Sequence, residues 1–153
     1  LVGSEMCIRD RIISPELLRK LVLPWHKKFA ELAHKYNKMY WLHCCGNVLQ
    51  LMDDFIEDVK IDAKHSFEDE IMPVTHFKKK YGDRVAVLGG VDVDKLCRME
   101  EKQLRQYVSN ILDECMQDGG YALGSGNSIA NYIPVKNFLV MLDEGIKWAE
   151  QNL

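Results

Sequence analysis

Apolar residues follow two different spacings along the chain, and each spacing predicts one kind of secondary structure. Apolar positions that recur every three or four residues indicate amphipathic helices, whereas short apolar runs without polar alternation indicate strands buried on both faces. The helical spacing covers residues 15–36, 48–56, 73–81, about 93–115 and 134–149. The predicted strands are residues 39–42, 59–63, 85–88 and 121–123.

Capping residues support several of these boundaries. Ser14 precedes Pro15, which is a typical helix start: a hydroxyl cap and then a proline whose missing N–H costs nothing in the first turn. Pro24 lies inside the first helical run and predicts a kink there. Gly82 follows the run 73–81 and predicts its C-terminal cap.

The order of the predicted elements, a helix followed by four strand–helix units, indicates an α/β fold with parallel strands and right-handed crossovers. A doubly wound sheet and a piece of a (β/α)8 TIM barrel both have this order. Four units are half of the eight in a barrel, which takes roughly 250 residues in all. The number of units is therefore compatible with both architectures. In both architectures ligands bind beyond the carboxyl ends of the strands.

Composition narrows the class of protein. The 153 residues are 47% hydrophobic and 28% charged, with a formal net charge of −3, which excludes a disordered chain and the basic surface of a nucleic-acid-binding protein. No apolar run approaches the ~20 residues that cross a bilayer. Five cysteines without a secretory signal favour a reducing, cytoplasmic setting over a disulfide framework.

Residues 1–11 show no helical or strand spacing that continues into the following helix. Their string, LVGSEMCIRDR, is typical of translated sequencing-adaptor read-through, so we predict that they are not native and exclude them from the fold. Cys7 would then have no functional role. On this interpretation the native domain covers residues 12–153 and begins in the middle of a longer protein.

The segment His43-Cys44-Cys45-Gly46 follows the first predicted strand and carries the strongest chemical signal. Residues i and i+2 of a strand point to the same side, so His43 and Cys45 can meet. An imidazole nitrogen and a thiolate are ligands that Zn²⁺ prefers. Both residues could instead be packing groups, because cysteine often serves as a small core residue.

Two more polar residues at strand ends are candidate catalytic residues. His65 could approach His43 and Cys45 as a third ligand or a proton-transfer group, or it could be a loop histidine bonded to backbone. Asp92 could hold a proton or a cationic group. Equally, Asp92 could stabilise its turn while Asp94 caps the following helix.

Glycines follow the last two predicted strands. Gly89 and Gly90 would let the backbone approach a ligand closely. The loop at residues 124–128 (GSGNS) offers small residues beside an amide, but it lacks the lysine of a phosphate-binding loop and the GxGxxG spacing of a dinucleotide site. The residues predicted to bind a cofactor here are Gly89, Gly90, Gly124, Gly126 and Asn127.

Five ordered segments resemble the uroporphyrinogen decarboxylase superfamily. They are SPELL at 14–18, HCCGN at 43–47, GDRVAVLGGVD at 82–92, GGYALGSGNSI at 119–129 and PVKNF at 134–138. Members of this superfamily are (β/α)8 barrels, and the chain is similar only to their C-terminal half. The resemblance therefore implies four parallel βα units of a TIM barrel with a preceding helix, and an N-terminal half-barrel that is missing.

The superfamily has two main branches. One decarboxylates uroporphyrinogen in haem synthesis without a cofactor. The other consists of corrinoid methyltransferases, which move a methyl group between a corrinoid on a partner protein and a thiol, and which bind zinc through an H-x-C pair and a later cysteine. His43 and Cys45 match the pair, whereas decarboxylases lack it and usually read GNLDP where this chain reads GGVDV at 89–93.

One residue departs from the methyltransferase pattern, because the later zinc cysteine corresponds to Asn127. Either His65 or Glu68 would then complete the ligands, or zinc would be bound weakly or not at all. The resemblance thus implies zinc, a corrinoid protein and a small thiol as the cofactor and partners of a methyltransferase.

Two other functions stay open from the sequence. A metal-independent decarboxylase of a tetrapyrrole would need basic residues for the acidic side chains of its substrate, and Lys64 is the main candidate. A non-catalytic module that binds a corrinoid or tetrapyrrole is the third possibility. The chain alone is expected to be inactive and to aggregate or pair with a second copy, because half a barrel leaves apolar edges open.

Overall fold

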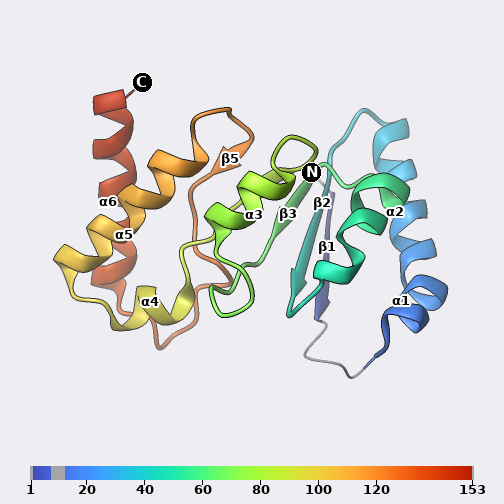
Figure 1. The fold of residues 1–153 in the computed structure, drawn as a ribbon, viewed down its shortest axis with the longest axis horizontal. Coiled ribbons are helices and arrows are strands. Elements are labelled where there is room, and N and C mark those ends of the chain that lie inside the picture. Colours follow the sequence, from blue (N-terminus) through green and yellow to red (C-terminus); the bar gives the residue numbers. More distant parts are fainter. Residues whose placement is uncertain (1, 8–12, 153) are drawn as a thin grey trace.

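The fold is built on one parallel sheet (Figure 1). The computed structural model describes the backbone of residues 2–7 and residues 13–152 with their side chains. The strands are β1 (Val2–Cys7), β2 (Tyr40–Cys45), β3 (Ala63–His65), β4 (Ala86–Leu88) and β5 (Tyr121–Ala122), in the order β1-β2-β3-β4-β5 with all neighbours parallel. A doubly wound sheet reverses its order at a switch point, and this sheet does not. The order is that of a barrel wall and confirms a partial TIM barrel.

Helices connect successive strands and cover the sheet. They are α1 (Pro15–Leu21), α2 (Leu23–Lys35), α3 (Val74–Tyr81), α4 (Val93–Arg98), α5 (Glu101–Cys115) and α6 (Val135–Asn152), with a 3₁₀ turn η1 (Leu49–Leu51) and a π-helical segment η2 (Asp54–Val59) between β2 and β3. Figure 1 shows α1 and α2 at one end of the sheet and α5 and α6 at the other. Within the described part of the chain, every helix is too short or too polar to cross a membrane.

Two predicted helices are each divided in the structure. The first run separates into α1 and α2 at Val22, because Pro24 stands in the first turn of α2, where its missing N–H is tolerated. Pro24 therefore begins a second helix instead of kinking one. The run 93–115 separates into α4 and α5 at Met99 and Glu100, whose backbones are extended, with ψ angles of 142° and 151°.

The second helical run and the second strand also differ from the prediction. Residues 48–56 wind partly as η1 and the start of η2 rather than as an α-helix. Because η2 continues to Val59, β3 begins only at Ala63 and ends at His65. Val59 and Ile61 are still buried, so their apolar character reflects packing in the core rather than a strand.

The segment 1–11, which was excluded from the predicted fold, contributes a strand in the structure, because Val2–Cys7 forms β1. This strand pairs in parallel with β2, from Val2 opposite Tyr40 to Cys7 opposite Cys45. The open edge of a strand offers backbone N–H and C=O groups to any extended segment, so the pairing requires no particular pattern of side chains. Residues 8–11 lie outside the described residues, and the non-native origin of the segment 1–11 stays a prediction.

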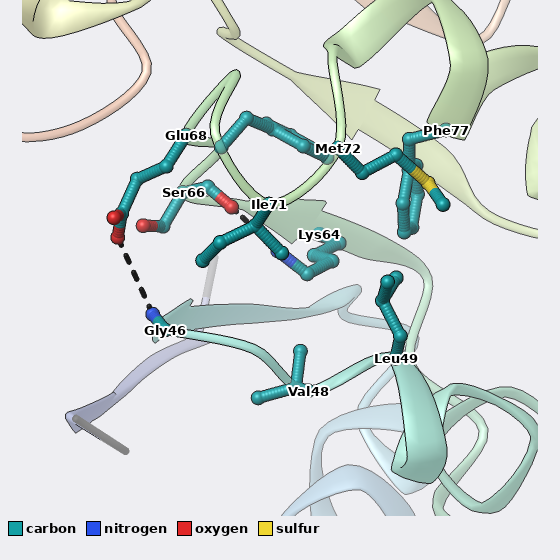
Figure 2. Close-up of a pocket in the computed structure, with 10 residues that line it drawn as sticks. Gly46, Val48, Leu49, Lys64, Ser66, Glu68, Ile71, Met72 and Phe77 are labelled. Carbon is teal, nitrogen blue, oxygen red and sulfur yellow. Dashed lines mark hydrogen bonds between the residues drawn. The ribbon is translucent and has the colours of Figure 1, made fainter. Parts of the chain in front are cut away.

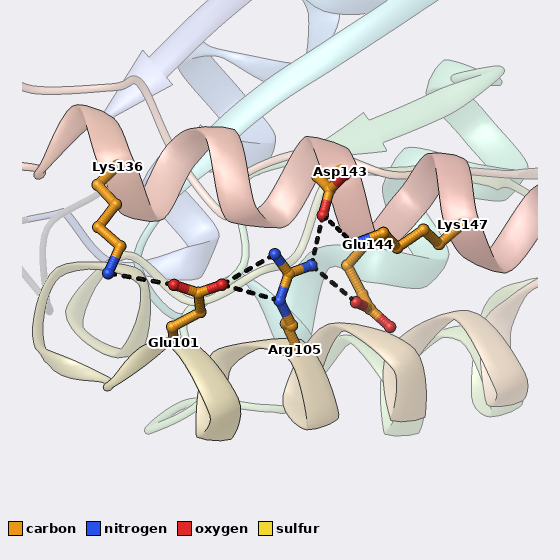
Figure 3. Close-up of polar contacts among 6 residues, drawn as sticks. All are labelled: Glu101, Arg105, Lys136, Asp143, Glu144 and Lys147. Atoms are coloured by element: carbon orange, nitrogen blue, oxygen red, sulfur yellow. Dashed lines mark hydrogen bonds and ion pairs between the residues drawn. The ribbon is translucent and has the colours of Figure 1, made fainter.

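Helices α5 and α6 pack side by side and are joined by ion pairs (Figure 3). Arg105 of α5 contacts Glu101 on its own helix at 3.0 Å, and Asp143 and Glu144 on α6 at 2.6 and 3.1 Å. Lys136 of α6 reaches back to Glu101 at 3.1 Å. One guanidinium that serves three carboxylates fixes the position of α6 along α5.

Candidate functional site

The register of β2 and β3 brings two of the predicted site residues side by side. His43 is the partner of His65 in the parallel ladder. Their Nδ1 atoms lie 2.7 Å apart and their ring centroids 4.8 Å apart. Both side chains stand at the carboxyl edge of the sheet, where barrels bind their ligands.

The sulfur of Cys45 lies at the centre of a polar cluster that three strand ends contribute. His43 Nε2 is 3.2 Å from the sulfur, Ser66 Oγ donates to it at 3.4 Å, and Asn127 Nδ2 donates to it at 3.3 Å. The Oδ1 atom of Asn127 accepts from the backbone N–H of Ser128 at 2.8 Å, so its amino group faces the sulfur. We call His43, Cys45, Ser66 and Asn127 the Cys45 cluster.

His65 stands behind His43 as viewed from the sulfur. Its Nδ1 faces the Nδ1 of His43, on the ring edge opposite the Nε2 that faces Cys45, and its own Nε2 is 3.1 Å from the carbonyl oxygen of Ser125. One metal ion cannot contact His65 Nδ1 and Cys45 together while the ring of His43 lies between them. Burial lowers the pKa of His65 more than the bond to Ser125 raises it, which favours a neutral ring.

Lys64 points into an apolar pocket next to the cluster (Figure 2). Only 4% of the residue is exposed, its Nζ donates to the carbonyl oxygen of Ser66, and it lies 4.3 Å from the ring centre of Phe67. Burial lowers the pKa of Lys64 to about 8, against the opposing effect of nearby thiols and of Glu68. A side chain held in this way does not present its charge to a carboxylate substrate.

Asp92 is the N-cap of α4 rather than an open carboxylate. Its Oδ1 accepts from the N–H groups of Asp94 and Lys95 at 2.9 and 3.1 Å, and its Oδ2 accepts from the N–H of Asp69 at 2.9 Å. Of the two roles considered for Asp92, the structure shows the turn-stabilising one, and the cap of the helix is Asp92 instead of Asp94. Both oxygens of Asp92 accept hydrogen bonds from backbone N–H groups, as its structural role requires.

The glycines that were predicted to bind a cofactor lie close to the protein's own atoms. Gly89 has a φ of +82°, and a Cβ on it would lie 2.3 Å from the carbonyl oxygen of Ser125. A Cβ on Gly126 would lie 2.3 Å from the carbonyl oxygen of Phe67. Gly90 and Gly124 also have close protein neighbours, Val74 and Gly89. These glycines let the loops after β3, β4 and β5 approach one another.

An acidic cleft of about 660 Å³ lies beside the Cys45 cluster, over the loops that follow β3 and β4. The carboxylates among its lining residues are Glu68, Asp69, Glu70, Asp92 and Asp94, and the basic lining residue is Lys95, whose Nζ is 2.6 Å from Asp69. Asn127 belongs both to the cleft wall and to the Cys45 cluster. An excess of carboxylates attracts cations and repels polyanions.

The donor set of the cluster fits zinc in part. Nitrogen and sulfur atoms bound tetrahedrally to zinc at about 2.1 and 2.3 Å are about 3.6 Å apart, close to the 3.2 Å between His43 Nε2 and Cys45 Sγ. Asn127 offers the sulfur a donor rather than a metal ligand, and the Oε1 of Glu68 accepts from the N–H of Gly46 at 3.4 Å. Among the described residues, no three His, Cys, Asp or Glu side chains are grouped to hold a metal ion. The pair would supply two of four ligands.

Two serines that no sequence pattern indicated, Ser66 and Ser125, also belong to the site. Ser66 donates to the sulfur from a backbone with a φ of +82°, a region that residues other than glycine seldom occupy. From the sequence, Ser66 could have been recognised only by its position directly after His65 at the end of a strand. Ser125 contributes its backbone carbonyl, which no pattern of side chains can reveal.

Comparison with known proteins places the chain in a family. No curated protein matches the sequence. A solved structure of a methyltransferase from Methanosarcina mazei is similar, with a TM-score of 0.73 and 20% sequence identity over 95% of this chain and 43% of that chain. This likeness is one of fold, and the chain spans less than half of that protein. The family described as uroporphyrinogen decarboxylase (URO-D) matches residues 8–148. Because that match covers most of the chain and agrees with the sequential parallel sheet, the chain belongs to the uroporphyrinogen decarboxylase family.

Proposed function

We propose that the chain is part of an enzyme that moves a methyl group between a corrinoid on a partner protein and a thiol, with His43 and Cys45 at the reaction site. The observation that carries this proposal is the 3.2 Å approach of His43 Nε2 to Cys45 Sγ at the carboxyl edge of the sheet. The similar fold of a protein named as a methyltransferase agrees with it.

We propose zinc as the metal of this site. His43 and Cys45 would hold it, and the remaining ligands would come from outside the described residues or from the thiol substrate. Bound zinc supplies positive charge that lowers the pKa of a coordinated thiol, so that the nucleophilic thiolate is available at neutral pH.

The other members of the Cys45 cluster orient the sulfur. A thiolate has three lone pairs, and hydrogen bonds from Ser66 Oγ and Asn127 Nδ2 engage two directions around it. The remaining direction faces His43 Nε2, where a metal ion or a proton can be shared. Ser66 and Asn127 therefore hold the sulfur in the orientation that the proposal requires.

The acidic cleft favours methyl transfer over decarboxylation of a tetrapyrrole. Uroporphyrinogen carries acidic side chains, which the carboxylates lining the cleft would repel. Lys64, the basic residue that the sequence offered for such a substrate, is buried and bonded to backbone. A neutral or cationic thiol fits this cleft better than an anionic substrate does.

Metal analysis of the chain tests the site directly. After equilibration with zinc and removal of the excess, we expect about one zinc ion per chain in the wild type and a loss of this zinc in His43→Ala and in Cys45→Ala. Cys97→Ala is the matched control, because Cys97 lies outside the cluster, where its thiol contacts the carbonyl of Tyr132. Zinc that survives both cluster substitutions would contradict the proposed site.

The reaction is tested on a longer family member that carries the same HCCG and GSGNS segments, because this chain spans 43% of the similar methyltransferase. Such a protein is expected to transfer the methyl group of methylcobalamin to a thiol and to lose this activity when the cysteine that matches Cys45 is replaced. Release of CO₂ from uroporphyrinogen would favour the decarboxylase instead. Binding of cobalamin without turnover would favour a binding module.

A further inference from the structure

We propose that His65 is a positioning residue, which fixes the tautomer of His43 and thereby directs the Nε2 lone pair of His43 toward Cys45. The use of that lone pair for a metal ion rests on the proposed function. The tautomer itself follows from two contacts among described residues, and it can be measured without any metal.

The first contact sets the proton on His65. Its Nε2 lies 3.1 Å from the backbone carbonyl oxygen of Ser125, and a carbonyl oxygen can only accept a hydrogen bond. The proton of His65 must therefore be on Nε2. Because a neutral imidazole carries one N–H, the Nδ1 of His65 is left as an acceptor.

The second contact passes this constraint to His43. The two Nδ1 atoms are 2.7 Å apart, and a hydrogen bond between them needs one donor and one acceptor. Since the Nδ1 of His65 accepts, the Nδ1 of His43 donates and carries the proton. The Nε2 of neutral His43 then has its lone pair free of a proton, and this atom is the one that lies 3.2 Å from the sulfur of Cys45.

Close packing holds the carbonyl and the two rings in this order. A Cβ on Gly89 would lie 2.3 Å from the carbonyl oxygen of Ser125 and 3.0 Å from Cδ2 of His65. The absence of a side chain at Gly89 is what allows the loop after β5 to place its carbonyl against the ring. A histidine that binds a metal commonly donates its other N–H to a fixed acceptor, and here that acceptor is a second imidazole.

Histidine tautomers can be read from long-range ¹H–¹⁵N correlation spectra of the ¹⁵N-labelled, metal-free chain at mildly alkaline pH. We expect His43, assigned with His43→Gln, to be protonated on Nδ1 in the wild type. His65→Phe removes the acceptor, so His43 should shift toward the tautomer protonated on Nε2. His65→Asn keeps an oxygen near the former Nδ1 and should retain much of the wild-type tautomer.

Two spectra would overturn the inference: a wild-type His43 protonated on Nε2, or a His43 tautomer that stays the same in folded His65→Phe. The wild-type spectrum decides the matter even if a variant does not fold. A chelator competition then measures zinc affinity, which should fall about 10- to 100-fold in His65→Phe and less in His65→Asn. A wild type that binds no zinc but shows the expected tautomer would defeat the proposed function and leave the role of His65 intact.

Discussion

The side-chain amide of Asn127 lies 3.3 Å from the sulfur of Cys45, although 82 residues separate the two along the chain. They meet because β2 through β5 are parallel neighbours, so the loops that follow these strands share one edge of the sheet. The resemblance to methyltransferases implies a third zinc ligand, a cysteine, at residue 127. In this chain residue 127 is an asparagine, and its side-chain amide donates a hydrogen bond to the sulfur of Cys45.

Asn127→Cys should therefore convert a two-ligand site into a three-ligand site. We expect its zinc affinity to rise at least about tenfold over the wild type, which corresponds to about 1.4 kcal/mol. Asn127→Ala is the control, because it removes the same hydrogen bond without adding a ligand. Competition with a chromogenic chelator gives both affinities, and equal affinities in the two variants would show that residue 127 is not in reach of the metal.

Much of the site could be predicted from sequence because it follows from strand geometry. His43 and Cys45 share a face through their i, i+2 spacing, and the order of the elements predicts that strand ends converge. The direction of the His65 ring could not be predicted, because the backbone carbonyl of Ser125 sets it from 60 residues away. The close approach of Gly89 to the same carbonyl of Ser125 could not be predicted either, for the same reason.

Parts of the fold could not be predicted because packing against neighbouring elements overrides the apolar spacing within a segment. The spacing of residues 48–56 is helical, yet this segment and the residues after it wind into a 3₁₀ turn and a π-helical segment that bury Phe55 and Val59. β1 carries no recognisable strand pattern, because its partner β2 supplies a ladder of backbone hydrogen bonds. In both cases the decisive interaction comes from a neighbouring element and leaves no periodicity in the segment itself.

Gly89→Ala should destabilise the chain through a clash as well as through backbone strain. The new Cβ would lie 2.3 Å from the carbonyl oxygen of Ser125, and the φ of +82° is unfavourable for alanine. Gly119→Ala is the matched control, because Gly119 has a φ of +69° and no atom within 4 Å of its Cβ position. We expect about 1 kcal/mol for the control from strain alone and about 2–4 kcal/mol for Gly89→Ala in urea unfolding. Equal losses of unfolding free energy in the two variants would mean that the loop after β5 moves to accommodate the new Cβ at little cost.

Because of Lys64, the free energy of unfolding of the chain should change with pH in the alkaline range. Its pKa is 10.5 as a free side chain and is lowered by burial to about 8 in the folded chain. Below about pH 8 both states are protonated, and the folded state bears the cost of a buried charge. Between about 8 and 10.5 the unfolded state binds the proton and the folded state does not, so the contribution of Lys64 to stability rises with pH.

The variant Lys64→Met isolates this effect, since other groups also titrate at high pH. The free energy of unfolding of Lys64→Met relative to the wild type should fall by about 3 kcal/mol as the pH rises from about 7 to about 10.5. Lys79→Met, at an exposed lysine, should show a nearly constant difference. Denaturant titrations at several pH values measure both, and parallel curves for Lys64→Met and the wild type would show that Lys64 keeps its usual pKa in the folded chain.

An exposed apolar face on α1 and α2 should make the chain associate with itself. At a spacing of three or four residues, this face carries Leu17, Leu21, Trp25, Phe29, Leu32 and Tyr36, each between 47% and 65% exposed. Covering apolar surface gains about 25 cal/mol for each Å² removed from water, so the face favours contact with another molecule. Replacing Trp25 and Phe29 together by Glu should lower the mass in light scattering toward the 17.7 kDa of one chain. Lys35→Glu, on an exposed position of α2 outside this face, should leave the mass unchanged. A wild-type chain that stays monomeric at high concentration and melts cooperatively would contradict the expectation of self-association.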